Sequence, residues 1–258
     1  MASFNPLFFL FTLGVTLAPS PTPGAQPVVF QSPAKQVTLV ELFTSEGCSS
    51  CPPADRWLAA LKPSPRLWVD FVPVAFHVDY WDHLGWRDPW SAKAHTDRQK
   101  SYAAAWRSPS FYTPCFVLNG GEWRGWSRST AGPPSSNTNA GVLKAISRDS
   151  NTWNVSFAPV AGRSRAYRGH IALLACGLIS NVAAGENRGR RLEHEFVVIA
   201  LAQGPLTLQG ASFQGELSLA KWSVEKSVRP AIAVWVTEAS RLEPLQSAGG
   251  WLSPGGKN

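Results

Sequence analysis

The sequence predicts an α/β domain, built on a central mixed sheet with flanking helices and one inserted helix, followed by a mainly β unit. Two apolar, β-branched runs without clean alternation, at residues 37–43 and 72–78, are typical of strands covered on both faces. The segment between them has helical spacing, so the order strand, helix, strand implies a right-handed parallel crossover. Beyond about Ser150 the chain turns into strand-like segments separated by Gly, Asn, Ser and charged turns. We therefore expect the α/β domain over residues 36–150 and the β unit over residues 151–258.

The elements of the first domain follow in order along the chain. A helix is expected after CSSCPPAD, where apolar residues fall at helical spacing until Lys62-Pro63. The second strand leads into the aromatic, acidic loop DYWDHLGWRDPW and then into the inserted helix at about residues 91–107. FYTPCFVLNGGEWRGW predicts two strands around Asn119-Gly120-Gly121, a strong hairpin signal. GPPSSNTN is a turn-rich connection, and AGVLKAISRD is expected to form a short closing helix.

Charge and composition limit the classes of function. The 258 residues are 44% hydrophobic and 16% charged, which is enough apolar material for a buried core. The formal charge of +7 comes from scattered basic residues, which we interpret as solvated surface and as an argument against a nucleic-acid partner. The one dense basic cluster lies in GENRGRRLEHEF, which could present Arg188, Arg190, Arg191 and His194 to an anion or to the first domain. Such runs are more often solvated hairpins or connections.

The N-terminal residues predict export. Residues 7–18 are apolar and precede a stretch rich in Pro and small residues, with candidate cleavage positions after Ala18 and Ala25. This pattern predicts a signal peptide over residues 1–25, too short for a spanning helix. Because no Lys or Arg precedes the apolar run, a membrane-retained segment is the alternative. No later stretch is long and apolar enough to span a bilayer, so we expect a periplasmic or secreted protein without a stable membrane span after cleavage.

Cys48 and Cys51 form a CxxC pair between a strand and a helix. A thiolate is the nucleophile of disulfide exchange, and a cysteine at a helix N-terminus is stabilised as thiolate by unpaired backbone N–H groups. The i, i+3 spacing brings the second sulfur close enough to attack a mixed disulfide. We therefore predict that the catalytic residues are Cys48, the attacking thiol, and Cys51, the resolving thiol. Because Pro52 and Pro53 suit a first helical turn, the regular helix is expected to begin nearer Cys51 than Cys48.

The order of elements around this pair resembles that of the thioredoxin fold. Cys48 and Cys51 match the redox pair of such proteins, and Thr113-Pro114 matches their cis-proline turn, which faces the pair. The resemblance implies that Thr113 and Pro114 line a substrate groove and that the bond between them is cis. Aromatic side chains of the loop after the second strand could form walls of this groove or bury their own rings over the domain: Tyr80, Trp81, Trp86 and Trp90.

A closer resemblance covers nearly the whole chain after the signal peptide. VELFTSEGCSSCPPAD, AFHVDYWDHLGWRDP, YTPCFVLNG and GENRGRRLEHEFVV together resemble the secreted bacterial family catalogued as domain of unknown function 1223. The resemblance implies a thioredoxin-like fold and export from a bacterial cell, while the activity and substrate of the family are unassigned. Cys115 follows the Thr-Pro where Gln is expected in that pattern, and this third thiol could interfere with the pair or simply pack.

The same cysteines could instead bind a metal. His77, Asp79 and His83 lie in HVDYWDH, and thiolates with imidazoles suit copper or zinc. The alternative ligand set is therefore Cys48, Cys51, His77 and His83. No closed tetrahedral spacing supports this set, and export favours disulfide chemistry for a CxxC pair.

The sequence as a whole predicts an exported thiol–disulfide oxidoreductase. We expect it to act on protein or small-molecule thiols and disulfides with an unidentified redox partner, and to use a redox-active disulfide without a further cofactor. Candidate modulators of the pair are Glu46, His77, Asp79 and Cys115. Cys176 is expected to be a buried apolar side chain, with pairing to Cys115 left open. The alternatives are a copper- or zinc-handling protein and a non-catalytic binding module. In the binding module the Cys48–Cys51 disulfide would be only structural, although a disulfide that closes so short a loop stabilises a protein little.

Overall fold

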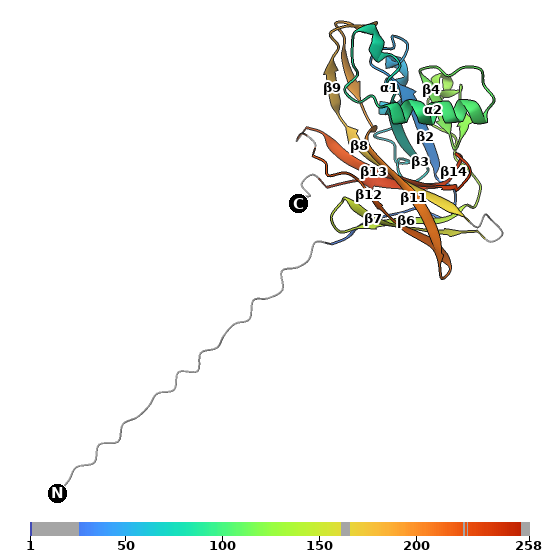
Figure 1. The fold of residues 1–258 in the computed structure, drawn as a ribbon, viewed down its shortest axis with the longest axis vertical. Coiled ribbons are helices and arrows are strands. Elements are labelled where there is room, and N and C mark those ends of the chain that lie inside the picture. The colour runs from blue at the N-terminus through green and yellow to red at the C-terminus, as the bar shows by residue number, and fades with distance from the viewer. Residues whose placement is uncertain (2–25, 161–165, 224, 226, 254–258) are drawn as a thin grey trace.

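The computed structural model describes Met1 and residues 26–160, 166–223, 225 and 227–253. The signal peptide expected over residues 1–25 therefore lies almost wholly outside the described residues. Within them, no helix combines the length and the apolar character needed to cross a membrane. Strands make up most of the regular structure, as Figure 1 shows.

Twelve strands pair into one large mixed sheet, and two further strands form a separate antiparallel pair. The strands are β1 (Val28–Gln31), β2 (Thr38–Thr44), β3 (Phe71–His77), β4 (Cys115–Leu118), β5 (Gly121–Glu122), β6 (Gly141–Ser147), β7 (Thr152–Pro159), β8 (Tyr167–Cys176), β9 (Leu178–Asn181), β10 (Arg191–His194), β11 (Val197–Gln209), β12 (Ser212–Ser218), β13 (Arg229–Glu238) and β14 (Pro244–Trp251). The α-helices are α1 (Pro52–Ala59) and α2 (Lys93–Ala105), and the 3₁₀ helices are η1 (Asp82–Leu84) and η2 (Trp126–Arg128). The main path through the sheet is β1-β6-β7-β12-β11-β3-β2-β4-β5, while β8 joins β11 to β13 and β13 pairs with β14.

The antiparallel pair β8 and β13 lies in the middle of the molecule, as the burial of both of its faces shows. On one face, Ala172 and Ala233 belong to the core that β2 and β3 share. On the other face, Leu173 and Val234 belong to the core formed with β6, β7 and β12. Successive side chains of a strand point to opposite faces. The uninterrupted apolar runs IALLAC and AIAVWV thus contribute side chains to two cores at once.

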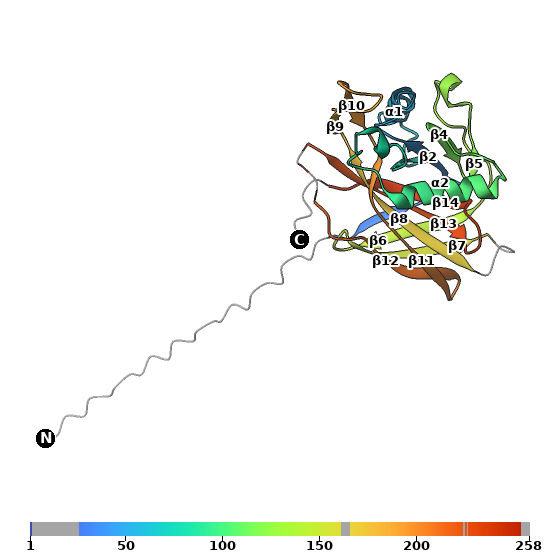
Figure 2. The same ribbon diagram turned by 45° about the horizontal axis from the view of Figure 1, so that its top comes forward.

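The CxxC segment lies at the end of the molecule that holds the two α-helices. β2 and β3 are parallel neighbours from Thr38↔Phe71 to Thr44↔His77, and every residue of both strands is buried. β4 pairs antiparallel with the other edge of β2. Figures 1 and 2 show α1 and α2 beside β2 and β4, away from β6 and β7. The carboxyl ends of the parallel strands β2 and β3 therefore open toward the same edge, where the chain leaves β2 for the CxxC.

The two segments that the sequence analysis separates near residue 150 contribute to one sheet. That boundary lies in the turn between β6 and β7, which pair with each other along their length. β11 also pairs with β3, at Val197↔Ala75. The amide nitrogen of the buried Gln246, on β14, donates to the backbone oxygens of Pro33 and Gly141, at 3.0 and 2.8 Å. These contacts join strands from the second half of the chain to segments from its first half.

The predicted fold class is wrong. An α/β domain with flanking helices covers the faces of its sheet with helices, whereas the described residues hold only two α-helices beside a twelve-stranded sheet. Strands cover strands here, because the apolar faces of β8 and β13 pack against other parts of the same sheet. The closing helix expected in AGVLKAISRD is the strand β6, in which buried and partly exposed residues alternate from Gly141 to Ser147. A period of two is the pattern of a strand with one buried face.

Several local predictions are confirmed. The apolar runs at 37–43 and 72–78 form parallel strands, and helices follow the CxxC and the aromatic loop. The hairpin of β4 and β5 turns at Asn119-Gly120, where both residues have positive φ, 44° and 91°. A Cβ on Gly120 would lie 2.9 Å from the Cα of Glu243, so glycine is needed there for space as well as for conformation.

Candidate functional site

The CxxC pair lies in the turn that connects the end of β2 to α1. The backbone N–H of Cys48 donates to the Ser45 oxygen at 3.2 Å, and the N–H of Cys51 donates to the Cys48 oxygen at 3.2 Å. Cys51 is the N-cap residue of α1, whose first turn begins with two prolines. Gly47 is required in this turn, because a Cβ there would lie 2.9 Å from the Cβ of Trp81. The helix thus starts at Pro52 with Cys51 as its N-cap, and Cys48 lies about one turn before it.

The sulfur of Cys48 lies among hydrogen-bonding groups. It is 3.3 Å from the Ser50 hydroxyl and 3.8 Å from the carbonyl oxygen of Thr113. The Cys48 residue is only 1% exposed, while Ser49 and Ser50 on its solvent side are exposed. The hydrogen bond from Cys51 lowers the pKa of Cys48 to about 6, against the opposing effect of burial and with help from Ser50. Cys48 is therefore largely a thiolate at neutral pH.

The second thiol has the opposite character. Cys51 is wholly buried. Burial raises the pKa of Cys51 well above its usual value, and the Cys48 thiolate and the Asp55 carboxylate reinforce this effect. The pair therefore consists of one ionised and one protonated sulfur. No disulfide is present among the four cysteines, all of which are free and buried.

Thr113 and Pro114 lie beside the pair, where the resemblance to the thioredoxin element order implies them. The Thr113-Pro114 peptide bond is cis. The Thr113 carbonyl faces the Cys48 sulfur, and its hydroxyl accepts a hydrogen bond from the indole nitrogen of Trp81 at 2.8 Å. Tyr80 is half-buried next to Trp81 and donates to the side-chain oxygen of Gln99 at 3.3 Å. Trp81 thus contacts the segment that faces the nucleophile directly, and Tyr80 reaches it through Gln99, whose amide nitrogen donates to the Tyr112 backbone oxygen at 2.7 Å.

A buried polar network lies under the CxxC turn, and Trp86 belongs to it. The indole nitrogen of Trp86 donates to Oε2 of Glu46 at 2.7 Å, and Oε1 of Glu46 lies 3.1 Å from Nε2 of His194. Nδ1 of His77 lies 2.7 Å from Oδ2 of Asp88, which also accepts the backbone N–H of Glu46 at 2.9 Å. The His77 and His194 rings meet edge to face, with centroids 4.9 Å apart.

Charge pairing within this network is strong enough to overcome burial. Burial alone would lower the pKa of His77, but the adjacent Asp88 carboxylate raises it above its usual value. Burial alone would likewise raise the pKa of Asp88, but His77 lowers it. The two residues therefore form an ion pair that anchors the backbone of Glu46, two residues before Cys48. Asp55, by contrast, has a pKa raised by burial, partly offset by His194 and His77.

The second half of the chain closes over the CxxC turn through the connection between β9 and β10. The Asn187 amide nitrogen donates to the backbone oxygens of Glu46 and Cys48, both at 2.8 Å. Glu186 accepts the backbone N–H of Ser49 at 2.9 Å. Asn187 is wholly buried, so its two bonds are shielded from water, whereas the bond between Glu186 and Ser49 is exposed. The connection therefore fixes the conformation of the turn that carries the nucleophile.

Sequence reasoning missed most of this network. Asp88, Glu186 and Asn187 were not candidates, although the GENRGRRLEHEF segment that contains Asn187 was singled out for its charges. Of the charged residues named in that segment, His194 reaches the site, whereas Arg191 is exposed and pairs with Glu193. A buried asparagine in a basic run carries no local pattern. Its role depends on a contact across 139 residues of sequence to Cys48.

The histidines and the aspartate of HVDYWDH lie in separate surroundings. His77 is buried in the ion pair with Asp88. His83 is exposed, and its Nδ1 lies 2.8 Å from the backbone oxygen of Tyr80. Asp79 accepts a hydrogen bond from the Thr96 hydroxyl at 2.5 Å. Within the described part of the chain, no three His, Cys, Asp or Glu side chains are grouped so that they could hold a metal ion.

The two remaining cysteines have inert surroundings. Burial raises the pKa of Cys115 to about 12, with the Glu122 and Glu41 charges adding to the effect. Burial also raises the pKa of Cys176 to about 12, and its sulfur accepts the backbone N–H of Phe196 at 3.3 Å. Both thiols therefore remain protonated at neutral pH.

Comparison with known proteins places the chain by family and by fold. Residues 39–237 match the family model described as "Protein of unknown function (DUF1223)". The structure is similar to the crystal structure of protein AGR_C_4864 from Agrobacterium tumefaciens, with 24% identity, a TM-score of 0.58 and coverage of 87% of this chain and 97% of that one. It is also similar to HBP35 of Porphyromonas gingivalis, with 12% identity, a TM-score of 0.56 and coverage of 86% and 76%. At these identities the similarity concerns the fold alone. No curated protein sequence matches the chain significantly.

Proposed function

The chain belongs to the DUF1223 family, whose description names no activity, and from its CxxC geometry we propose that it is a thiol–disulfide oxidoreductase acting through Cys48 and Cys51. The observation that carries this proposal is the contrast between the two sulfurs. Cys48 has a pKa lowered to about 6, while the pKa of Cys51 is raised well above its usual value. An exchange reaction needs one thiolate to attack and a second thiol that waits until the mixed disulfide has formed.

The proposed reaction has two steps. The Cys48 thiolate attacks one sulfur of a substrate disulfide, so a Cys48 mixed disulfide forms and one substrate thiolate leaves. Cys51 then loses its proton and attacks the Cys48 sulfur, which forms the Cys48–Cys51 disulfide and releases the second substrate thiolate. The two released thiolates take up the proton from Cys51 and one from water. The substrate disulfide gains two electrons, and the protein dithiol loses two; the reverse sequence would oxidise a substrate dithiol.

Formation of the mixed disulfide would itself remove one cause of the raised pKa of Cys51. The negative charge of Cys48 is one cause of the raised pKa of Cys51, and that charge disappears once Cys48 is covalently bound. Burial and the Asp55 carboxylate remain. The second thiolate therefore becomes easier to form at the moment when it is needed, which disfavours premature reaction of Cys51 with solvent oxidants.

The low pKa of Cys48 in this proposal comes from hydrogen bonds more than from the helix. α1 starts at Pro52 with Cys51 as its cap, so Cys48 lies outside the first turn, where the field of a helix falls off. The donors are the Cys51 thiol and the Ser50 hydroxyl and backbone. The sequence predicts a thiolate stabilised by the helix N-terminus, whereas the proposed site stabilises it by hydrogen bonds. In both cases Cys48 is ionised.

We propose protein or small-molecule thiols and disulfides as substrates and an exported location for the reaction. Cys48 is 1% exposed, so a substrate sulfur must approach over Ser49 and Ser50. Two exposed aromatic side chains, Phe111 at 37% and Tyr112 at 42%, directly precede Thr113 in the chain, and the Phe111 ring packs edge to face against Tyr80. They could hold an extended peptide beside the nucleophile. Fractionation of cells that produce the full chain tests the location, and protein found only in the cytosol would contradict export.

Thiol trapping tests the function. Exchange is measured with a disulfide-linked model peptide and with glutathione disulfide as separate substrates. We expect Cys48→Ser to lose exchange with both, and Cys51→Ser to accumulate a mixed disulfide that mass spectrometry assigns to Cys48. Cys115→Ser is the matched control and should exchange as the wild type does. Full exchange by Cys48→Ser, in a protein whose circular dichroism is unchanged, would refute the proposal.

A further inference from the structure

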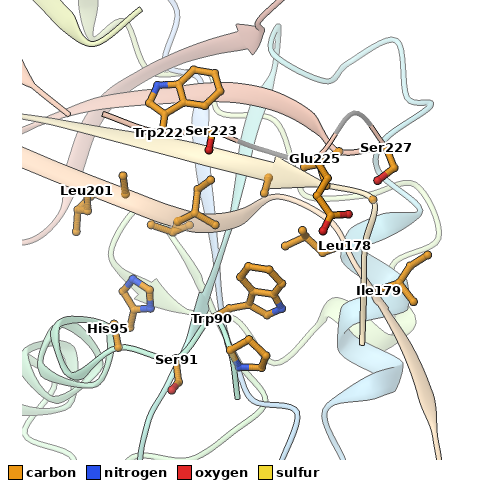
Figure 3. A pocket seen from close by; sticks show the side chains of 18 of the residues that line it. Trp90, Ser91, His95, Leu178, Ile179, Leu201, Trp222, Ser223, Glu225 and Ser227 are labelled. Carbon is orange, nitrogen blue, oxygen red and sulfur yellow. The ribbon is translucent and has the colours of Figure 1, made fainter. Parts of the chain in front are cut away.

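A cavity of about 830 Å³ lies between the start of α2 and the strands β8, β9 and β11. Its volume is within the range of about 300–1,000 Å³ that is usual for small-molecule sites. Figure 3 shows the His95 and Trp90 rings on one side of it and Leu178, Leu201 and Trp222 on the other. None of these side chains belongs to the CxxC site, so the cavity is a separate feature of the molecule.

Apolar side chains make up much of the cavity walls, and some of them reach solvent. Trp90 packs against a small core of Ala175, Leu178, Val197 and Val228. Ile179 and Leu201, which also line the cavity, are 52% and 37% exposed. Leaving such side chains in water is unfavourable by roughly 25 cal/mol per Å² of apolar surface. An apolar ligand in the cavity would cover them.

His95 provides one polar group in these walls. The residue is 94% buried, as its exposed fraction is 6%. Its Nδ1 lies 2.9 Å from the backbone oxygen of His77, and because a carbonyl oxygen only accepts, Nδ1 must carry the proton. Burial lowers the pKa of His95, which keeps the ring neutral. Nε2 is then a hydrogen-bond acceptor, and it has no partner among the described residues.

The mouth of the cavity does not select a charged ligand. Lys221 and Glu225 carry opposite charges, and both are exposed. Among the described residues, the buried part offers the neutral acceptor of His95 and the unpartnered indole N–H of Trp90, and no cation. A carboxylate would therefore meet the lone pair of Nε2, while a neutral hydroxyl or N–H group would donate to it.

We infer that this cavity is a binding site for a neutral, mainly apolar small molecule that carries one hydroxyl or N–H donor, held by His95 and covering Ile179 and Leu201. The hydrogen bond to Nε2 orients the ligand, and the apolar walls provide most of the affinity. The site does not depend on the redox proposal, because no CxxC residue lines it.

Calorimetry with two matched probes tests the inference. 2-Naphthol has a hydroxyl donor, and 2-methoxynaphthalene has the same rings without the donor. We expect one 2-naphthol molecule to bind per chain, and 2-methoxynaphthalene to bind about tenfold more weakly, the typical effect of one hydrogen bond. Equal affinity of the wild-type protein for both probes, or no binding of 2-naphthol, would overturn the inference without the need for any variant.

Variants then locate the binding. His95→Phe should weaken 2-naphthol about tenfold, to the level of the methoxy probe, and leave that probe unchanged. Ala94→Trp places a large ring from an exposed position of α2 into the cavity, and should abolish binding of both probes. His83→Phe, at an exposed histidine outside the cavity, is the matched control and should bind both normally. Undiminished binding by Ala94→Trp would place the probes elsewhere and refute the site.

Discussion

Replacement of Cys51 by alanine should change the acidity of Cys48 more than any other single substitution near the pair. The hydrogen bond from Cys51 is the largest of the causes that bring the pKa of Cys48 from 9.0 to about 6. A thiol with a pKa of about 6 is about 90% ionised at pH 7, and one with a pKa of about 9 is about 1% ionised. Cys51→Ala should therefore move the titration midpoint of Cys48 upward from about 6 toward 9.0, a rise of about three pH units if the return is complete.

The reaction rate would report this change poorly. A thiolate of higher pKa is also a better nucleophile, with a Brønsted coefficient of about 0.4–0.5. A rise of about three pH units in pKa would then make each thiolate about twentyfold more reactive, which offsets much of an approximately ninetyfold loss of ionised thiol at pH 7. The rate at pH 7 should fall only severalfold. The pH midpoint is therefore the quantity to measure.

The assay follows the ultraviolet absorbance of the thiolate from pH 4 to pH 10, with Cys48→Ser as the blank. The wild type should show a midpoint near pH 6, and Cys51→Ala a midpoint well above it. Ser50→Ala, which removes the hydroxyl 3.3 Å from the Cys48 sulfur, should give a smaller upward shift. A Cys51→Ala midpoint that stays near 6 would refute the assignment of Cys51 as the main source of thiolate stabilisation.

Further predictions concern stability and the remaining thiols. The pKa of His170 is lowered to about 3, first by burial and then by the charges of two arginines. Between about pH 6.5 and 3 the unfolded state therefore binds one more proton than the folded state. The free energy of unfolding falls as the pH falls through this window. His170→Phe should flatten the acid side of urea-unfolding curves by up to about 1.4 kcal/mol per pH unit, and an unchanged slope would contradict the neutral state of His170. Arg98→Met should cost about 3–5 kcal/mol in urea unfolding, because it leaves the buried Glu41 carboxylate without the guanidinium 2.6 Å away. Adding Glu41→Gln should recover part of the loss, and a single mutant as stable as the wild type would refute the role of this pair. Because the pKa values of Cys115 and Cys176 are raised to about 12, iodoacetamide at pH 7 should modify neither in the native protein, and rapid labelling of either would contradict their burial.

The site could be predicted where it depends on short stretches of sequence. A buried run, a CxxC and two prolines determine the turn that carries Cys48, and all lie within the 17 residues of VTLVELFTSEGCSSCPP. Thr113-Pro114 was found through resemblance and lies beside Cys48. Asp88 and Asn187 could not be found in this way. Each acts through one buried hydrogen-bonding group, and periodicity and spacing give no information about which distant backbone such a group contacts.

The fold could be predicted strand by strand but not as a whole. The chain beyond about Ser150 was expected to consist of strand-like segments, which include the apolar runs of β8 and β13, because β-branched and apolar residues between turn signals favour strands. Their partner strands could not be identified, because a pattern of apolar residues indicates that a face is covered but does not indicate which element covers it. The segment that forms β6 was expected to be a helix, but its pairing with β1 and β7 imposes the period of two. Tertiary pairing decided the outcome in each case.

A redox titration of Cys48 and Cys51 tests the central proposal most directly. The mature protein is equilibrated in glutathione and dithiothreitol buffers of known potential, its free thiols are alkylated after acid quenching, and mass spectrometry determines which cysteines are joined. The proposal predicts a single Cys48–Cys51 disulfide with a midpoint between about −270 and −120 mV, the range of thiol oxidoreductases. A Cys48–Cys51 bond that persists below about −300 mV, or a titration in which these two cysteines never pair, would contradict it.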